Sequence, residues 1–376
     1  MPLTTMRILT LSYEFPPLGG GGARVVEGLA RELTRIGHEV DIVTMGFPGL
    51  PDHEGVEGFN LYRLASVRKR ADICHTREMV PHLLSAYPLV KRLVATRKYD
   101  INHTHFIFPD GVLAWRLSQI SGLPYVITAH GSDVPGYNPN RFQFQHFLLS
   151  PLWRCVVKNA ARVICPSVHL QGLLKKASNS AKSEIIPNGM SEDKFNPVRT
   201  KRMRILVVTR MFERKGVQYL LKALRGRTLD CEINIVGDGP YLETLKRMAM
   251  DTPADIHFWG WLNNESDELK ELYETSRIFV FTSQRENFPV NLLEAMTAGM
   301  AIVISEDPGS AEVVGDAALH VPDNQPEQFF DTLQRLVRDP VLCDELGRKA
   351  RRRFETHFTW PTIAREYHKL FEKVLC

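Results

Sequence analysis

The chain has 376 residues, of which 44% are hydrophobic and 24% charged, and it carries a formal net charge of +4. This balance excludes a disordered or collagen-like chain, and the length allows two or three domains that each bury a core. Even the most apolar runs, such as residues 278–282, are only as long as a strand, so no membrane-spanning helix is expected.

The first half of the chain alternates strand-like and helix-like segments. A strand at 7–12 leads through glycines at 19–22 into a helix in which Val26, Leu29, Ala30 and Leu33 share one face. Further strands are predicted at 39–44, 60–64, 101–105, 125–130, 162–166 and 184–186. This alternation predicts a parallel sheet covered by helices, a doubly wound α/β domain.

A second series follows a polar linker that runs from about residue 187 to 202. Its strands are predicted at 203–210, 232–237, 255–259, 278–283, 301–305 and 318–321, with helices at 217–224 and 291–298 among them. A final helix at 360–375 has one apolar face, formed by Ile363, Tyr367, Leu370, Phe371 and Val374. We therefore predict a first domain at 1–189, a second at 190–359, and residues 360–376 packing back on the first.

Chemistry in such folds lies at the carboxyl ends of the strands, and two doubly wound domains that face each other form a cleft there. The glycines at 19–22 open the first helix, where free amides suit a phosphate, although the run fits neither the Walker nor the dinucleotide pattern. Arg210 and Lys215 follow the second domain's first strand and could bind one anion such as a diphosphate. His130 and Asp133 follow a first-domain strand, and Asp133 could orient the imidazole or cap the turn.

Glu286 is predicted in a loop and Glu294 inside the helix that Pro289 opens as a first-turn residue. No metal-binding pattern occurs, and the six cysteines are scattered, so we expect no bound metal, no disulfide framework and a reducing compartment. Because the first residues do not form a signal peptide, a cytoplasmic location is expected.

In their order and spacing these residues resemble the family 4 glycosyltransferases of the GT-B fold, over nearly the whole chain. The motifs that carry the resemblance are the glycines before 23–26, His130-Gly131-Ser132-Asp133, Pro187-Asn188-Gly189, Arg210 with Lys215-Gly216, Gly237-Asp238-Gly239-Pro240, and 286–296. Such enzymes transfer a sugar from a nucleotide-diphosphate donor with retention of configuration. Asn287 stands where the family usually has glycine.

The resemblance implies a role for each matching position. Arg210 and Lys215 would hold the donor diphosphate with the amides of Gly21, Gly22, Asn287 and Phe288. Glu294 would bind the ribose, Glu286 the donor sugar, and His130 would lie beside the anomeric carbon. Gly237, Trp261 and Leu262 belong to the donor side, the last two in a base-binding turn, whereas Asp133 and Asn188 belong to the acceptor side. No metal or other cofactor is implied, and same-face attack by the acceptor hydroxyl is the mechanism usually proposed.

The acceptor is indicated only by charge and apolarity in the first domain. Residues 63–98 hold nine basic and two acidic side chains, and an apolar set among them fits either a core helix or a helix on anionic lipid. The basic residues Arg68, Lys69, Arg70, Lys91 and Arg92 are the candidate anionic-surface patch. We expect a glycan or lipid-linked acceptor, a UDP-sugar before GDP-mannose as donor, and peripheral membrane contact if the patch binds lipid.

No nucleic-acid-binding module accompanies this basic charge. A non-catalytic nucleotide-sugar-binding partner and a nucleotide-sugar epimerase or hydrolase remain alternatives.

Overall fold

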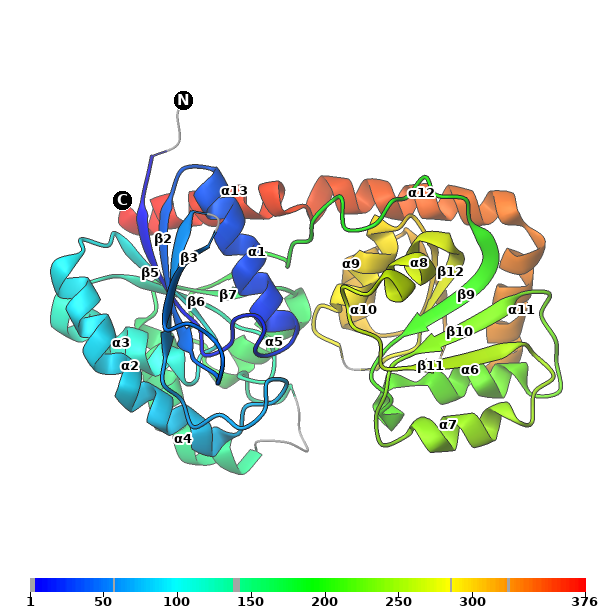
Figure 1. The fold of residues 1–376 in the computed structure, drawn as a ribbon, viewed down its shortest axis with the longest axis horizontal. Coiled ribbons are helices and arrows are strands. Elements are labelled where there is room, and N and C mark those ends of the chain that lie inside the picture. The colour runs from blue at the N-terminus through cyan, green and yellow to red at the C-terminus, as the bar shows by residue number, and fades with distance from the viewer. Residues whose placement is uncertain (1–3, 57, 138–142, 285, 323–324) are drawn as a thin grey trace. The chain divides into compact units, whose positions relative to one another are not determined.

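The computed structural model describes all residues except 1–3, 57, 138–142, 285 and 323–324. The chain divides into two compact units, residues 1–189 with 360–376, and residues 190–359. Each unit is a doubly wound α/β sandwich built on its own sheet (Figure 1). Among the described residues, none of the helices combines the length and apolarity that crossing a membrane requires.

Unit 1 contains a sheet in the order β3-β4-β2-β1-β5-β6-β7-β8, parallel except for the β3–β4 pair. Its strands are β1 (Arg7–Leu11), β2 (Glu39–Met45), β3 (His53–Val56), β4 (Phe59–Leu64), β5 (Ile101–His105), β6 (Tyr125–Thr128), β7 (Arg162–Cys165) and β8 (Ser183–Ile185). Its helices are α1 (Gly21–Arg35), α2 (Thr76–Thr96), α3 (Asp110–Ser121), α4 (Gln143–Asn159), α5 (Val168–Ala177) and α13 (Trp360–Leu375). The edge strand β3 was not predicted, whereas the other strands lie within two residues of their predicted bounds.

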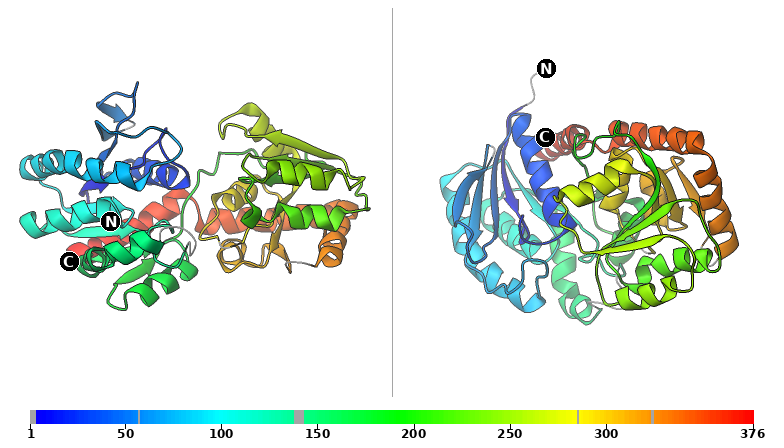
Figure 2. Two further views of the ribbon diagram at one scale, coloured as in Figure 1. Left: turned by 90° about the horizontal axis from the view of Figure 1, so that it is seen from below. Right: turned by 45° about the vertical axis from the view of Figure 1, so that its right-hand side comes forward.

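Apolar side chains alternate between the two faces of this sheet, so both faces need helices. Leu9 and Leu11 of β1 point into a core formed with α2, α3, α4 and α5. Ile8 points to the opposite core, which α1 and α13 cover. Figure 2 shows these layers from two further directions.

Helix α13 lies beside α1 and completes that second core (Figure 1). Ile363, Tyr367, Leu370 and Phe371 are all buried there, as the predicted apolar face requires. At the start of α13 the indole of Trp360 is packed so closely against Gly28 and Gly189 that a Cβ on either glycine would clash with it. Unit 1 is thus assembled from both ends of the described chain.

Unit 2 contains a wholly parallel sheet in the order β11-β10-β9-β12-β13-β14. Its strands are β9 (Arg202–Val208), β10 (Glu232–Val236), β11 (Ile256–Gly260), β12 (Ser276–Phe281), β13 (Ala301–Ser305) and β14 (Ala318–Val321). Its helices are the short 3-10 helix η1 (Glu213–Lys215), α6 (Val217–Leu224), α7 (Leu242–Ala249), α8 (Asp267–Thr275), α9 (Val290–Thr297), α10 (Pro308–Val314), α11 (Pro326–Arg338) and α12 (Pro340–His357). One face packs on α8, α9, α10 and α12, and the other mainly on α6, α7 and α11.

Candidate active site

Both sheets have a topological switch point, where the strand order reverses and the loops at the carboxyl ends diverge. In unit 2 it lies between β9 and β12, and in unit 1 between β1 and β5. Lys215 and Glu286 lie in the loops beside the switch point of unit 2, and Gly21 and Gly22 follow β1 beside that of unit 1. Each unit is therefore described as its own half-site.

Lys215 and Glu286 form an ion pair at the switch point of unit 2. Lys215 ends η1, which follows β9, and Glu286 lies in the loop that follows β12. The Nζ of Lys215 donates to Oε1 of Glu286, which also accepts a hydrogen bond from the Oγ of Ser283. The guanidinium of Arg214 lies 3.8 Å from the same carboxylate oxygen. The loops thus bring together two predicted residues that are 71 positions apart.

Burial and charge act together on this pair. Burial lowers the pKa of the Lys215 ammonium, although Glu286 opposes the shift, and the charges of Arg214 and Arg210 lower it further. Burial alone would raise the pKa of the Glu286 carboxyl, but the Lys215 ammonium and the Ser283 hydroxyl hold it below its ordinary value. The result is a desolvated cation whose present counter-ion is a side chain, an arrangement suited to exchange for an anionic ligand.

Gly216 allows the two loops to approach each other. It adopts a φ of +73°, and a Cβ there would clash with the carbonyl oxygen of Thr282 at the end of β12. The Thr282 hydroxyl in turn donates to the carbonyl oxygen of Lys215, at 3.0 Å. The backbone around the ion pair is therefore fixed from both strands.

Arg210 differs from Lys215 in its surroundings. It is exposed, and its guanidinium carbon lies 6.0 Å from the centroid of the Phe212 ring. The loop that follows β9 thus carries one mostly buried cation, Lys215, and two exposed cations, Arg210 and Arg214. The Lys215 ammonium and the Arg210 guanidinium can neutralise different oxygens of a diphosphate.

Glu294 lies on α9, in a second polar cluster of unit 2. Its Oε1 accepts from the Nζ of Lys194 at 2.7 Å, and its Oε2 accepts from the hydroxyl of Tyr273 at 2.8 Å. Neither partner was predicted, since Lys194 lies in the charged linker and Tyr273 looks like an ordinary apolar-face residue of α8. Helix α9 itself begins at Val290, so Pro289 is its N-cap rather than a residue of its first turn.

The loops that follow β10 and β11 are joined by one backbone hydrogen bond. The amide of Gly237 donates to the carbonyl oxygen of Gly260 at 2.7 Å, which places the glycine turn beside Trp261 and Leu262. Trp261 is 70% exposed, so its indole ring is accessible from solvent. A Cβ on Gly237 would clash with the carbonyl oxygen of Thr209, so this turn also packs tightly against the end of β9.

Asn287 and Phe288 are both buried between the Glu286 loop and α9. The Phe288 ring packs edge-on against Phe358, with ring centroids 5.6 Å apart. A Cβ on Gly309 would clash with the backbone carbonyl of Glu286, so α10 packs directly on this loop. The Glu286 loop is therefore held by its neighbours on both sides.

In unit 1 the glycine turn and His130 lie against each other. Helix α1 begins at Gly21, and a Cβ on Gly22 would lie 2.9 Å from the Phe106 ring and 3.4 Å from Nδ1 of His130. The Nε2 of His130 shares a hydrogen bond of 3.0 Å with Nδ1 of His105. Burial lowers the pKa of His130 to about 4, so its imidazole is neutral at pH 7.

Asp133 does not orient the imidazole, the first of the two roles considered for it. It is buried, its Oδ1 accepts from the amides of His130 and Gly131, and its Oδ2 accepts from the amide of Ile107. It therefore closes the turn that carries His130 and is not available to an acceptor. Asn188 is also buried, next to the glycine packed under Trp360.

Arg68 corrects the expected basic patch. Its side chain is fully buried, and it donates to the carbonyl oxygens of Tyr13, Arg70 and Ala71 and lies 3.8 Å from Glu14. The carbonyl of Ala71 also accepts from the amide of Gly19, so Arg68 supports the glycine turn from behind. Because its side chain is fully buried, Arg68 does not reach the surface to bind an anion there. Lys69, Arg70, Lys91 and Arg92 are exposed, although Arg70 is paired with Asp72.

The apolar side chains of helix α2 (76–96) are partly in the core and partly on the surface, the two positions that the sequence left open. Ala86, Val90 and Leu93 of α2 are buried in the sheet core, whereas Val80 and Leu84 are 51% and 72% exposed. Val80 and Leu84 are four residues apart and so share one side of the helix. Helix α2 is thus a core helix with a small exposed apolar edge.

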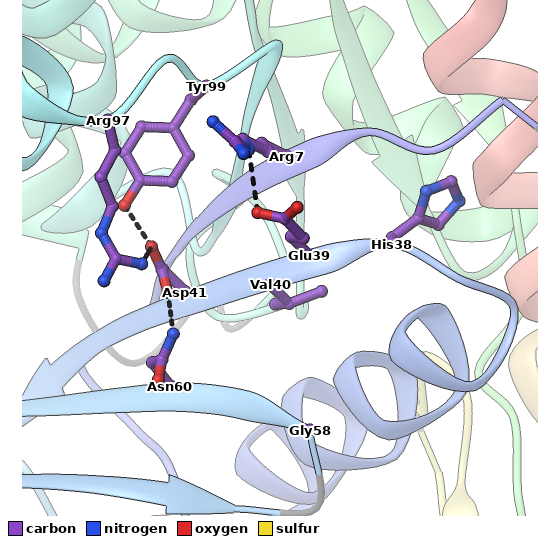
Figure 3. Close-up of a pocket in the computed structure, with 9 residues that line it drawn as sticks. All are labelled: Arg7, His38, Glu39, Val40, Asp41, Gly58, Asn60, Arg97 and Tyr99. Carbon is purple, nitrogen blue, oxygen red and sulfur yellow. Dashed lines mark hydrogen bonds and ion pairs between the residues drawn. The ribbon is translucent and has the colours of Figure 1, made fainter.

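Figure 3 shows a cavity of about 350 Å³ that lies away from these groups, at the amino ends of β1, β2, β4 and β5. Its charged side chains satisfy one another: Asp41 accepts from Asn60, Arg97 and Tyr99, and Glu39 accepts from Arg7. Ligands of parallel sheets bind at the opposite edge. This cavity therefore contributes nothing to the candidate site.

Two family models match consecutive parts of the chain. The model described as Glycosyltransferase Family 4 matches residues 19–194, and that described as Glycosyl transferases group 1 matches residues 190–353. The chain belongs to the family 4 glycosyltransferases of the GT-B fold. The first model covers the half-site of unit 1 and the second covers that of unit 2.

Relatives and solved structures of this glycosyltransferase span it from end to end. A GDP-mannose-dependent phosphatidylinositol monomannoside mannosyltransferase of Mycolicibacterium smegmatis is 25% identical over 94% of this chain and 95% of its own. Sucrose-phosphate synthase of Thermosynechococcus elongatus superimposes with a TM-score of 0.80 at 22% identity, covering 98% and 99% of the two chains. HepE of Anabaena, solved in complex with UDP-glucose, gives 0.73 at 15% identity, covering 98% and 100%.

Proposed function

We propose that this glycosyltransferase moves a hexose-type sugar from a nucleotide-diphosphate donor to a hydroxyl group, with retention of configuration and without a metal ion. The observation that carries the proposal is the buried Lys215–Glu286 pair at the switch point of unit 2. A donor diphosphate would take over Lys215, and Glu286 would be released to contact the transferred sugar. Replacement of Glu286 by the diphosphate at Lys215 would thus bind the leaving group and also free Glu286 to position the transferred sugar.

For the other residues we propose the roles that the family resemblance implies. Arg210 would neutralise a second diphosphate oxygen, and the amides at the starts of α1 and α9 would bind phosphate through the positive ends of those helices. Glu294 would accept the ribose hydroxyls beside Lys194 and Tyr273. Trp261 and Leu262 would flank the base. In unit 1 the groups proposed for the donor are the neutral His130 and the amides of Gly21 and Gly22.

The chemistry rests on charge that develops in the transition state. As the bond from the anomeric carbon to phosphate lengthens, negative charge grows on the diphosphate, and Lys215 and Arg210 stabilise it. The acceptor hydroxyl attacks from the face that the phosphate leaves, and a phosphate oxygen takes the hydroxyl proton. No carboxylate in the matching motifs stands out as a covalent nucleophile, so we favour this same-face route.

We favour UDP as the nucleotide, with GDP as the second candidate. HepE was solved with UDP-glucose, and the mannosyltransferase relative is named for GDP-mannose. The turn that would meet the base offers backbone groups and the Trp261 ring, which accept either base. The donor must therefore be measured.

For the acceptor we propose a glycan or lipid-linked sugar, with peripheral contact to an anionic membrane. The supporting features are the exposed Val80 and Leu84 on α2 and the exposed Lys91 and Arg92 farther along the same helix. Apolar side chains with nearby cations are the pattern that adsorbs to anionic lipid. The named activity of the relative on a phosphatidylinositol mannoside points the same way.

A thermal-shift screen tests the donor proposal. The purified protein is melted with UDP, GDP and ADP and with UDP-glucose, UDP-GlcNAc and GDP-mannose, each with EDTA and with magnesium. We expect one base to raise the melting temperature equally under both conditions, because a ligand that binds only the folded state stabilises it. NMR of the product anomeric proton then tests retention. A shift that requires magnesium would refute metal independence, and no shift at all would favour a protein that does not use nucleotide sugars.

A further inference from the structure

Unit 1 contains a chain of buried polar side chains that ends at His130. The hydroxyl of Tyr367 on α13 contacts the Oγ1 of Thr128 at 2.9 Å. The Oγ1 of Thr128 in turn contacts the Nε2 of His103 at 2.8 Å. The His103 ring packs against the His105 ring, with centroids 4.4 Å apart. These side chains lie at the carboxyl ends of the neighbouring strands β5 and β6 and on the α13 face.

The last link of the chain is a hydrogen bond between two imidazoles. The Nδ1 of His105 and the Nε2 of His130 are 3.0 Å apart, the ring centroids are 5.3 Å apart, and the two ring planes are inclined by only 24°. Burial lowers the pKa values of both rings, that of His130 to about 4. When both imidazoles are neutral, only one of the two bonded nitrogens carries a proton and the other accepts the hydrogen bond. The tautomer of one ring therefore fixes that of the other.

The surroundings of the other nitrogen of His130 decide where this proton resides. The Nδ1 atom lies beside Gly22, in the first turn of the 15-residue helix α1. The amino end of a helix carries a partial positive charge, which favours a lone pair at that point and disfavours an N–H group. His130 therefore carries its proton on Nε2 and donates it to His105, and Nδ1 presents an acceptor.

We infer that His105 is a positioning residue: through its hydrogen bond it holds His130 in the Nε2–H tautomer, so that Nδ1 of His130 can accept a hydrogen bond from a sugar hydroxyl. The consequence for the sugar rests on the proposed function, whereas the tautomer does not. An acceptor nitrogen also places electron density near a reacting carbon that becomes positive. His105 itself is 1% exposed and is held between neighbouring rings, so it acts through His130.

Long-range proton–nitrogen NMR of protein labelled with ¹⁵N-histidine tests the inference, since the two tautomers give distinct patterns. We expect a single Nε2–H pattern for His130 in the protein without ligand. His105→Leu removes the acceptor at similar volume and should give a mixture of tautomers. His105→Asn places an amide group near the position of Nδ1 and should restore a single form. An Nδ1–H pattern or a mixture in the unaltered protein overturns the inference even if the Leu variant does not fold.

Isothermal titration with UDP separates this inference from the proposed function. His105→Leu should leave the dissociation constant of UDP unchanged within twofold, because every side chain proposed to hold the nucleotide lies in unit 2 and unit 1 is proposed to add only backbone amides of α1. With the sugar donor found in the screen, kcat should fall at least tenfold in His105→Leu and recover in His105→Asn. Failure of the unaltered protein to bind any nucleotide would refute the proposed function and leave the tautomer result standing. Equal kcat in all three proteins would refute the role of His105 in transfer.

Discussion

The ammonium of Lys215 is paired with the carboxylate of Glu286, and both groups are mostly buried at the switch point of one sheet. A buried cation that has lost its hydration gains more from an added anion than an exposed one does. Because the partner of Lys215 is a loop side chain, a ligand can displace it. The binding of nucleotide and the positioning of Glu286 are thus linked through a single contact.

Substitutions on the two sides of this pair should have different effects. Lys215→Ala should weaken UDP binding about tenfold or more, since a hydrogen bond to a charged group contributes roughly 1.5–3 kcal/mol. Glu286→Gln should bind UDP at least as tightly as the unaltered protein, because it no longer competes for Lys215, while losing most transfer activity. Titration calorimetry and a UDP-release assay measure the two effects. Lys246→Ala, which removes an exposed lysine of α7, is the matched control.

Arg68 and Arg70 are two residues apart but should respond very differently to truncation. Arg68→Ala removes a buried guanidinium that contacts three backbone carbonyls and leaves those acceptors without it. We expect the free energy of unfolding to fall by about 2–4 kcal/mol, in the range found when buried polar partners are removed. Arg70→Ala should leave the free energy of unfolding nearly unchanged, because the Arg70–Asp72 ion pair is exposed to solvent. Chemical denaturation measures both, and equal effects would contradict the buried role of Arg68.

Gly216 is expected to tolerate no side chain. Gly216→Ala places a Cβ against the carbonyl oxygen of Thr282 in a left-handed backbone conformation, so both the melting temperature and UDP affinity should fall. Gly172, inside α5, faces open space, and Gly172→Ala should leave stability unchanged or raise it by up to about 1 kcal/mol. Differential scanning fluorimetry with and without UDP distinguishes the two variants. An unaltered melting temperature in Gly216→Ala would argue against the close approach of the two loops.

Stability should decline on mild acidification because four histidines of unit 1 are neutral in the folded protein. Burial above all lowers the pKa to about 4 in His38 and His130, to about 3 in His103, and well below the ordinary value in His105. The unfolded chain therefore binds more protons than the folded one below pH 6.5, and unfolding becomes easier as pH falls from 6.5 towards 4. Each such group contributes up to about 1.4 kcal/mol per pH unit.

Melting temperatures measured in steps from pH 7.5 to pH 4.5 check this dependence. His38→Gln removes one of these four histidines and should make the decline of the melting temperature with falling pH shallower. His257→Gln is the control, since His257 lies in unit 2 with an exposed side chain. A pH profile identical to that of the unaltered protein in His38→Gln would show that His38 does not titrate as its burial requires.

Most of the fold was predictable because apolar periodicity and glycine turns mark buried parallel strands and the helices between them. The edge strand β3 was missed because its four residues, His53–Val56, contain no apolar run and are only partly buried. An edge strand is specified by pairing with its neighbour rather than by the core. The composition of residues 53–56 therefore does not predict that they form a strand beside β4.

The candidate site was predictable where chemistry follows directly from the end of a strand, as for Lys215, Glu286 and His130. The partners of Glu294 were not predictable, because Lys194 and Tyr273 are 100 and 21 positions away from it and carry no local signal. His105 could have been found, since its strand β5 ends beside the strand that leads to His130. The burial of Arg68 was invisible because in a sequence an arginine held by carbonyls looks the same as one in solvent.

The division of the chain also has a consequence for biosynthesis. Unit 2 is an uninterrupted segment inserted into unit 1, which requires both 1–189 and the helix at 360–376. During translation unit 2 can fold as soon as its own residues have emerged, whereas the core under α1 stays open until α13 arrives. Unit 2, which is proposed to bind the nucleotide, can therefore complete its fold first. Unit 1, which contains His130, completes its fold last.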